Sequence, residues 1–277
     1  MTSSLATRFG SNVSVFKQNS QLSDEQLFRV APSIFAGDKH NSRSDRYTYI
    51  PTSQVLNGLR NEGFMPFMAA QSRTRIEGKQ DFTKHMIRLR KADMITGDEA
   101  NEIVLINSHD GTSSYQMLAG VFRFVCQNGM VSGDTVEDIR VRHSGNIVNN
   151  VIEAAYEIID EFDTVNASIE NMKTTQLLLP EAQAYAEAAL SLKYDDEAPI
   201  RAQQLLTPKR YADQNKNDLW TTFNKVQENM MRGGQRGRNQ DGRRVSTRAV
   251  QSIDNNIKLN KALWILADKM AAMKHGV

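Results

Sequence analysis

The feature that most constrains the fold of this sequence is an apolar stripe that begins at Ile147 and ends at Met172. Its members follow one another at intervals of three or four residues, which is the repeat of one face of an α-helix. At roughly 1.5 Å per residue, one helix over this stretch is about 37 Å long. Acidic residues lie mainly off the stripe, so we expect the solvent-exposed face of this helix to be acidic. The stripe consists of Ile147, Val151, Ala154, Ile158, Phe162, Val165, Ile169 and Met172.

Strand patterns precede this stripe. Residues 82–91 alternate cleanly, which puts Arg88 and Arg90 on one face and Ile87 and Leu89 on the other. Further strand candidates are residues 64–75, 102–106 and 114–126, although the second half of the last segment could equally form a helix.

After the stripe the pattern is mostly helical. Apolar residues at helical spacing fill residues 219–230 and 259–273, and we expect these two helices to pair as an antiparallel hairpin. The patterns together predict an α+β fold, with a mostly antiparallel sheet packed by one long helix and a helical C-terminal region. The expected parts are a polar N-terminal arm at 1–45, an α+β core at 46–195, and the helical C-terminal region at 196–277 with a basic loop at 232–248.

The composition excludes several classes of protein. Hydrophobic residues make up 40% of the 277 residues and charged residues 24%, which is ordinary for a soluble globular protein. A single cysteine excludes an internal disulfide and a multi-thiolate metal site, and fits a reducing cytosol. The sequence shows no signal peptide and no apolar run long enough to span a membrane, so we expect a cytoplasmic protein.

The loop at 232–248 carries the most concentrated charge in the chain. It holds six arginines and one acid, whereas the whole chain has a net charge of only +2. Four glycines and one large hydrophobe, Val245, cannot build a core, so we expect a mobile loop. Guanidinium groups suit nucleic acid because they offer forked donors to phosphate and a flat face to bases. The alternatives are a solvated surface loop, a linker or a protein-docking arm. The arginines are Arg232, Arg236, Arg238, Arg243, Arg244 and Arg248.

A second basic set lies between residues 73 and 91, where seven cations accompany two acids. Adjacent antiparallel strands would merge these cations into one positive sheet surface, and the alternative is a solvated sheet face with cross-strand ion pairs. The side chains that we expect to contact phosphates along the sheet are Arg73, Arg75, Lys84, Arg88 and Arg90.

Base stacking needs exposed aromatic side chains, and only 7% of the chain is aromatic. We interpret most of the available rings as core residues. The rings considered are Tyr47, Tyr49, Phe64, Phe67, Tyr115, Phe122 and Phe124.

A histidine and a carboxylate, His109 and Asp110, lie in a predicted turn, and His143 follows later in the chain. Such a group could bind a metal or perform acid–base chemistry. Because the helical spacing of a ligand pair is lacking, we favour an Asp110 that bonds its own turn. Cys126 has no evident activating partner and is interpreted as a small buried hydrophobe. We expect no metal site, no cofactor and no catalytic residue.

Three stretches then become recognisable: Asn107-Ser-His-Asp-Gly-Thr112, Arg123-Phe-Val-Cys-Gln-Asn-Gly-Met130 and Arg142-His-Ser-Gly145. With the segment 32–51, they resemble a phage- and plasmid-borne family of unknown function, the cryptic-prophage proteins of the YfjQ and YafZ type. The resemblance covers roughly residues 30–275 and implies a mobile-element protein of the bacterial cytosol, without implying a chemistry. The motif residues of unassigned role are Asn107, His109, Asp110, Gly111, Arg123, Cys126, Asn128, Arg142 and His143.

The order of the predicted elements also resembles, more loosely, that of phage single-strand annealing proteins such as Redβ, Erf and Sak. Those proteins form rings or filaments that hold single-stranded DNA in a basic groove, although a shared order of elements does not fix a function.

Three hypotheses follow from the sequence. The first is a non-enzymatic protein that binds nucleic acid, with single-stranded DNA favoured, during replication or recombination of a mobile element. The second is an interaction protein that targets a host factor such as a defence system. The third is an enzyme that uses His109, Asp110 and His143. The candidate partners are therefore nucleic acid, a host protein and a second copy of the chain, with no membrane association expected.

Overall fold

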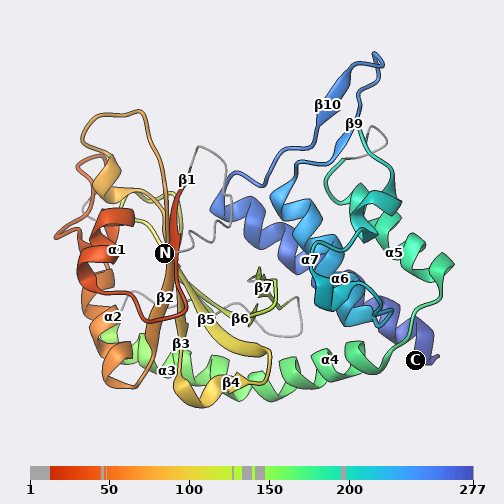
Figure 1. Cartoon of the computed structure of the whole chain (residues 1–277). Helices are drawn as coiled ribbons and strands as arrows, with labels where there is room; N and C mark the ends of the chain where they lie inside the picture. Colours follow the sequence, from red (N-terminus) through yellow and green to blue (C-terminus); the bar gives the residue numbers. More distant parts are fainter. Residues whose placement is uncertain are drawn as a thin grey trace.

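The protein is described by a computed structural model, which covers residues 13–44, 47, 49–126, 128–132, 139–140, 147–194 and 198–276. The fold is α+β, as the sequence predicts, with an antiparallel sheet followed by C-terminal helices (Figure 1). The strands of the main sheet are β1 (Val13–Lys17), β2 (Met65–Ser72), β3 (His85–Arg90), β4 (Ile95–Thr96), β5 (Glu99–Asn107), β6 (Gln116–Arg123), β7 (Asn128–Val131) and β8 (Ile139–Arg140). The α-helices are α1 (Asp24–Val30), α2 (Thr52–Asn61), α3 (Ile147–Asp160), α4 (Phe162–Thr174), α5 (Leu179–Ser191), α6 (Leu219–Arg232) and α7 (Ile253–His275).

The main sheet has the strand order β1-β2-β3-β5-β6-β7, while β4 pairs with β5 and β8 with β6. Neighbouring strands run antiparallel, and the longest ladder joins β5 to β6 from Ile106↔Gln116 to Glu99↔Arg123. This ladder decides between the two alternatives for residues 114–126, because β6 is a strand along most of that segment and a turn follows it.

Both faces of the central strands are buried. On one face Ile87 and Leu105 belong to the main core, which also includes residues of α2 and α3. On the other face Met86 and Val104 pack in a second cluster with Ile253 of α7. Every residue of β3 is therefore buried, including the polar ones.

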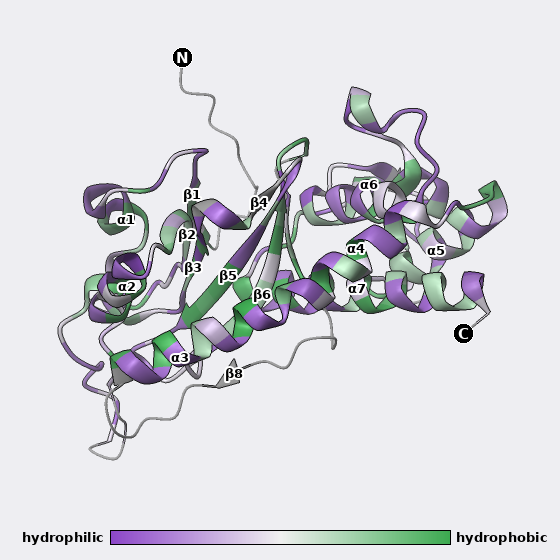
Figure 2. Cartoon of the chain, turned by 90° about the horizontal axis from the view of Figure 1, so that it is seen from below, coloured by the Kyte–Doolittle hydropathy of each residue, from purple (hydrophilic) through white to green (hydrophobic). Residues whose placement is uncertain are grey.

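The apolar stripe forms two consecutive helices, α3 and α4, separated by Glu161. Figure 1 shows them running along one side of the molecule, from the sheet to the C-terminal helices, and Figure 2 shows apolar and polar residues mixed along their length. Helix α3 contacts β6 and α2, whereas α4 contacts α6 and α7. The predicted long helix thus connects the sheet to the C-terminal region, with one interruption at Glu161.

The N-terminal residues that the structure describes do not form a detached polar arm. Strand β1 pairs with β2 along its whole length, and Leu27, Ala31 and Ile34 are fully buried. The short helix α1 begins with a capping box in which Ser23 and Gln26 bond each other's backbone. The expectation of an arm at 1–45 is therefore wrong over residues 13–44, because a few apolar side chains anchor this polar segment in the core.

Helices α6 and α7 contact each other, as their apolar stripes predict. The rings of Trp220, Phe223 and Trp264 form a cluster between them, with centroids 5.4–5.9 Å apart. Among the residues that the structure covers, no helix combines the length and the apolar character needed to cross a membrane.

Candidate nucleic-acid interface

The basic segment 232–248 is a β-hairpin, not the loose loop that its composition suggests. Strand β9 (Arg236–Arg238) pairs with β10 (Arg244–Ser246). Asn239 closes the turn, since its backbone NH donates to the carbonyl of Arg243 and its carbonyl accepts from Gly242. Gly242 has a φ of +73°, which glycine adopts without strain. The hairpin projects from the C-terminal helices (Figure 1).

The two faces of the hairpin differ in chemistry. The register Arg238↔Arg244 and Arg236↔Ser246 puts three arginines on one face, because residues two apart on a strand share a face. Gly237 and Val245 occupy the other face. A Cβ on Gly237 would lie only 1.8 Å from the carbonyl oxygen of Pro199, so glycine here permits close backbone contact. This contact fixes one face of the hairpin and leaves the arginine face open.

The exposed arginines of the hairpin lack acidic partners. Within the residues that the structure describes, no carboxylate lies within ion-pair distance of Arg236, Arg238, Arg243, Arg244 or Arg248, and all five are exposed. Arg238 and Arg244 stand directly opposite each other, and like charges in that position destabilise a strand pair. Arg238 Nη1 donates a hydrogen bond to the carbonyl of Gly242 at 2.7 Å, which offsets part of this repulsion. A bound anion would relieve this repulsion.

Arg232, at the base of the hairpin, has a different environment. Its Nη1 lies 3.2 Å from Glu228, and Arg210 binds the same carboxylate at 2.7 Å. Both arginines also donate to the backbone carbonyl of Cys126, at 3.2 Å from Arg210 and 3.4 Å from Arg232. Arg232 therefore joins helix α6 to the turn after β6. Arg210 is not among the residues predicted from the sequence, because nothing in the local sequence marks its partner Glu228.

The expected placement of Arg88 and Arg90 on a solvent-facing sheet surface is wrong. Both are buried, and both bind Glu102, Arg88 at 2.6 Å and Arg90 at 2.7 Å. Arg90 also lies over the ring of Phe122, 3.9 Å from its centroid. The alternation of the strand was predicted correctly, but the face that carries these arginines is covered, and the neighbouring strand supplies the counter-charge.

Three other cations of the second basic set lie in two different environments. Lys84 binds both carboxylate oxygens of Asp254 at the start of α7, at 2.7 and 2.8 Å. Arg73 and Arg75 are exposed, and Arg73 bonds the hydroxyl of Ser14. They lie on the segment between β2 and β3, which Figure 1 shows beside the N-terminal helices and apart from the β9–β10 hairpin. The set therefore does not form one continuous positive surface.

The motif around residue 109 contributes to a buried polar network. His109 and His85 are fully buried, with ring centroids 5.4 Å apart. Asn107 bonds the hydroxyl of Thr52, and Asp110 accepts from the backbone NH and the hydroxyl of Thr112, as the turn interpretation predicts. Lys79 adds an ion pair to Asp110 at 3.1 Å. Gly111 has a φ of +74° beside Arg43.

The motif around residue 123 joins the sheet to the C-terminal helices. The guanidinium of Arg123 makes two bonds to Asp213, at 3.1 and 2.7 Å, and both side chains are buried. Cys126 is buried as expected, within 3.7 Å of the Asn224 side chain, and burial raises the pKa of its thiol. Asn128 is buried opposite Arg123. Arg142 and His143 lie outside the described residues.

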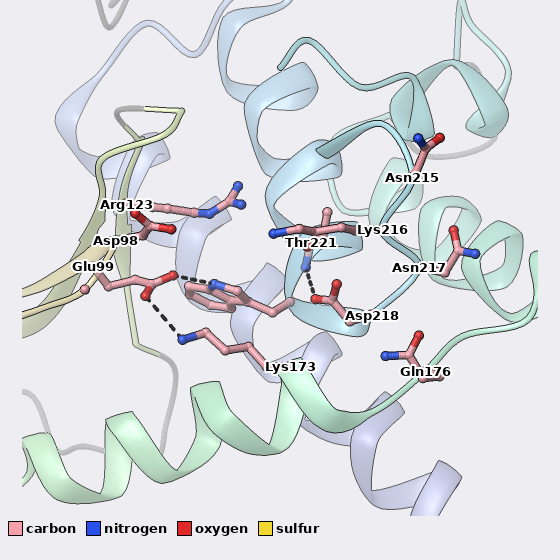
Figure 3. A pocket seen from close by; sticks show the side chains of 12 residues that line it. Asp98, Glu99, Arg123, Lys173, Gln176, Asn215, Lys216, Asn217, Asp218 and Thr221 are labelled. Carbon is pink, nitrogen blue, oxygen red and sulfur yellow. Dashed lines mark hydrogen bonds and ion pairs between the residues drawn. The ribbon is translucent and has the colours of Figure 1, made fainter. Parts of the chain in front are cut away.

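An open pocket of about 670 Å³ lies where the sheet meets the helical region (Figure 3). Glu99 is held there by the indole of Trp220 at 3.0 Å and by Lys173 at 3.2 Å. The charged side chains that line it are the cations Arg123, Lys173 and Lys216 and the acids Asp98, Glu99 and Asp218. Because the signs balance, the pocket offers a polyanion little attraction, and the hairpin is the stronger candidate.

Comparison with known proteins places the chain in a family. Residues 39–264 match the family described as "Domain of unknown function (DUF932)". The chain belongs to the DUF932 family. It is 50% identical to the UPF0380 protein YafZ of Escherichia coli (strain K12), over 96% of this chain and 97% of that protein. It is 49% identical, with the same coverage, to the UPF0380 protein YfjQ of the same organism. No solved structure matches the chain.

The shared carboxylate of Glu102 gives a direct test of the sheet in this DUF932 protein. Glu102→Gln should lower the free energy of unfolding by about 3–5 kcal/mol, because two buried guanidinium groups would lose their counter-charge. Chemical denaturation monitored by circular dichroism measures this change. Glu77→Gln, at an exposed position of the β2–β3 segment, is the matched control and should stay within about 0.5 kcal/mol. Equal effects of the two substitutions would refute the buried pairing.

The buried histidines predict a dependence of stability on pH. Burial, reinforced by His109, lowers the pKa of His85 to about 3, and burial lowers the pKa of His109 to about 4. As the pH falls below about 6.5 the unfolded chain binds protons that the folded chain does not, so stability should decrease.

The expected loss is up to about 1.4 kcal/mol per pH unit for each histidine. Urea unfolding of the DUF932 protein between pH 7 and pH 5 measures it, since most carboxylates titrate lower. His109→Gln should flatten the slope relative to the unmodified protein, because one buried histidine is removed. A slope that is the same in the variant and the unmodified protein would contradict the assignment.

Proposed function

We propose that this DUF932 protein binds single-stranded nucleic acid, DNA in preference, without catalysing a reaction, and that the β9–β10 hairpin makes the main phosphate contacts. The observation that carries the proposal is the arginine face of the hairpin. Arg236, Arg238 and Arg244 share that face, two of them directly opposed, with no acidic partner in the described structure. An arrangement that is repulsive by itself becomes favourable when phosphates lie between the charges.

The physical mechanism is the release of counterions. Each phosphate that an arginine neutralises frees condensed cations, so affinity falls with salt in proportion to the number of contacts. Guanidinium groups also present flat faces on which unpaired bases stack, which favours a single strand over a duplex. The sheet arginines Arg88 and Arg90 take no part in this proposal, since Glu102 neutralises them.

The proposal includes a role in the replication or recombination of a mobile element. Its support is the sequence resemblance to cryptic-prophage proteins and the similarity in element order to single-strand annealing proteins.

The decisive experiment replaces the four arginines at positions 236, 238, 243 and 244. The quadruple Arg→Ala variant should weaken binding of a fluorescent single-stranded oligonucleotide, and it should flatten the dependence of log affinity on log salt by up to roughly 3. Fluorescence anisotropy at several salt concentrations measures both quantities.

The quadruple Arg→Lys variant is the matched control, because it keeps the charge and removes the planar fork. It should retain most of the salt dependence while losing part of the affinity. If the alanine variant binds as the unmodified protein does, the hairpin assignment is wrong. If the unmodified protein ignores oligonucleotides and captures an acidic host protein through the hairpin, the interaction hypothesis replaces this one.

A further inference from the structure

The segment 198–211 lies along the hairpin and helix α6 and makes contacts with both. The carbonyl of Pro199 accepts from the backbone of Arg238 at 2.9 Å, and the side chain of Gln204 donates to the carbonyl of Arg236 at 3.0 Å. Farther along, the Asn229 side chain donates to the carbonyls of Leu205 and Thr207. The segment thus leads from the hairpin along the last turn of α6.

Cations gather where this segment ends. Lys209 is exposed next to Arg210, and Arg210 meets Arg232 across the carboxylate of Glu228. Partial desolvation lowers the pKa of Lys209; the nearby Glu228 opposes this shift, and Arg232 and Arg210 add to it. Burial and the same Arg232 lower the pKa of Lys17 to about 8. Lys209, Arg210 and Arg232 gather around the one carboxylate of Glu228, so this group of four side chains has a net positive charge, which an anion stabilises.

Tyr211 follows this cationic group directly, and its side chain faces solvent. It is 89% exposed, the largest value among the exposed large hydrophobic residues of the described chain. Two other exposed rings have local partners: Phe28 contacts the ring of Phe35, and the hydroxyl of Tyr156 bonds Glu62. The backbone at Tyr211 is nevertheless well fixed, because Asp213, two residues on, is bound to the buried Arg123.

We propose that Tyr211 is a base-stacking platform, and that the strand held by the hairpin continues across Lys209 to place one base on its ring. This inference rests on the proposed function and adds a path and a stacking residue to it. A ring next to lysine and arginine is the usual combination in proteins that bind single strands, since phosphates contact the cations while a base covers the ring. Stacking on tyrosine needs the ring and not the hydroxyl, so phenylalanine should serve equally well.

The test compares Tyr211→Ala with Tyr211→Phe on two probes of equal length, a normal single-stranded oligonucleotide and an abasic one with the same phosphates. On the normal strand, Tyr211→Ala should weaken binding about 5- to 100-fold, and Tyr211→Phe should bind as the unmodified protein does. On the abasic strand all three proteins should bind alike. The salt dependence should stay unchanged in both variants, because no cation is removed.

The outcomes separate this inference from the proposed function. Binding of the normal strand that Tyr211→Ala leaves unchanged overturns the stacking platform while the hairpin proposal stands. An equal loss on normal and abasic strands also overturns it, since the ring would then act through something other than a base. An unmodified protein that binds neither probe refutes the proposed function itself. Because Tyr211 is exposed, the substitutions should leave folding intact, which thermal unfolding checks.

Discussion

The carboxylate of Glu228 is the interaction on which the geometry of the candidate site depends. It is nearly buried, and it binds Arg210 from the segment beside the hairpin and Arg232 from the base of the hairpin. Both arginines also hold the carbonyl of Cys126, at the turn that follows β6. One acidic side chain therefore fixes the hairpin, the segment 198–211 and the edge of the sheet in a single arrangement, and the ion pair between Arg123 and Asp213 reinforces the same junction.

The arginines fall into two groups, those paired with a carboxylate and those without such a partner in the described structure. Arg88, Arg90, Arg123 and Arg210 each have a carboxylate within about hydrogen-bond distance, three of these arginines are buried, and their charge serves the fold. The hairpin arginines have no such partner in the described structure, and their charge is available to a ligand. Because a buried, paired guanidinium cannot reach phosphate without breaking its pair, only the second group can give salt-dependent binding of a polyanion.

The sequence predicted the parts of the structure that depend on local periodicity. The alternation in β3, the apolar stripe of α3 and α4 and the stripes of α6 and α7 each correspond to an observed element. The pairing of Arg88 and Arg90 could not be predicted, because it depends on the register that brings Glu102 beside them. The turn from Asn239 to Gly242 is a hairpin signal in the sequence. The high content of glycine and arginine around it favoured the prediction of a loop instead. The sequence does not single out Tyr211, because the exposure of a side chain is not visible in a sequence. The bonds from Arg210 and Arg232 to the backbone carbonyl of Cys126 do not depend on the residue type and are equally invisible there.

The central claim is that a single strand lies against the hairpin and not against the sheet. Ultraviolet cross-linking of the protein to a single-stranded oligonucleotide, followed by mass spectrometry of the peptides, tests this claim most directly. The account predicts cross-links concentrated within residues 198–211 and 232–248. Cross-links confined to β3, β5 or the segment between β2 and β3, with the hairpin peptides unmodified, would contradict it.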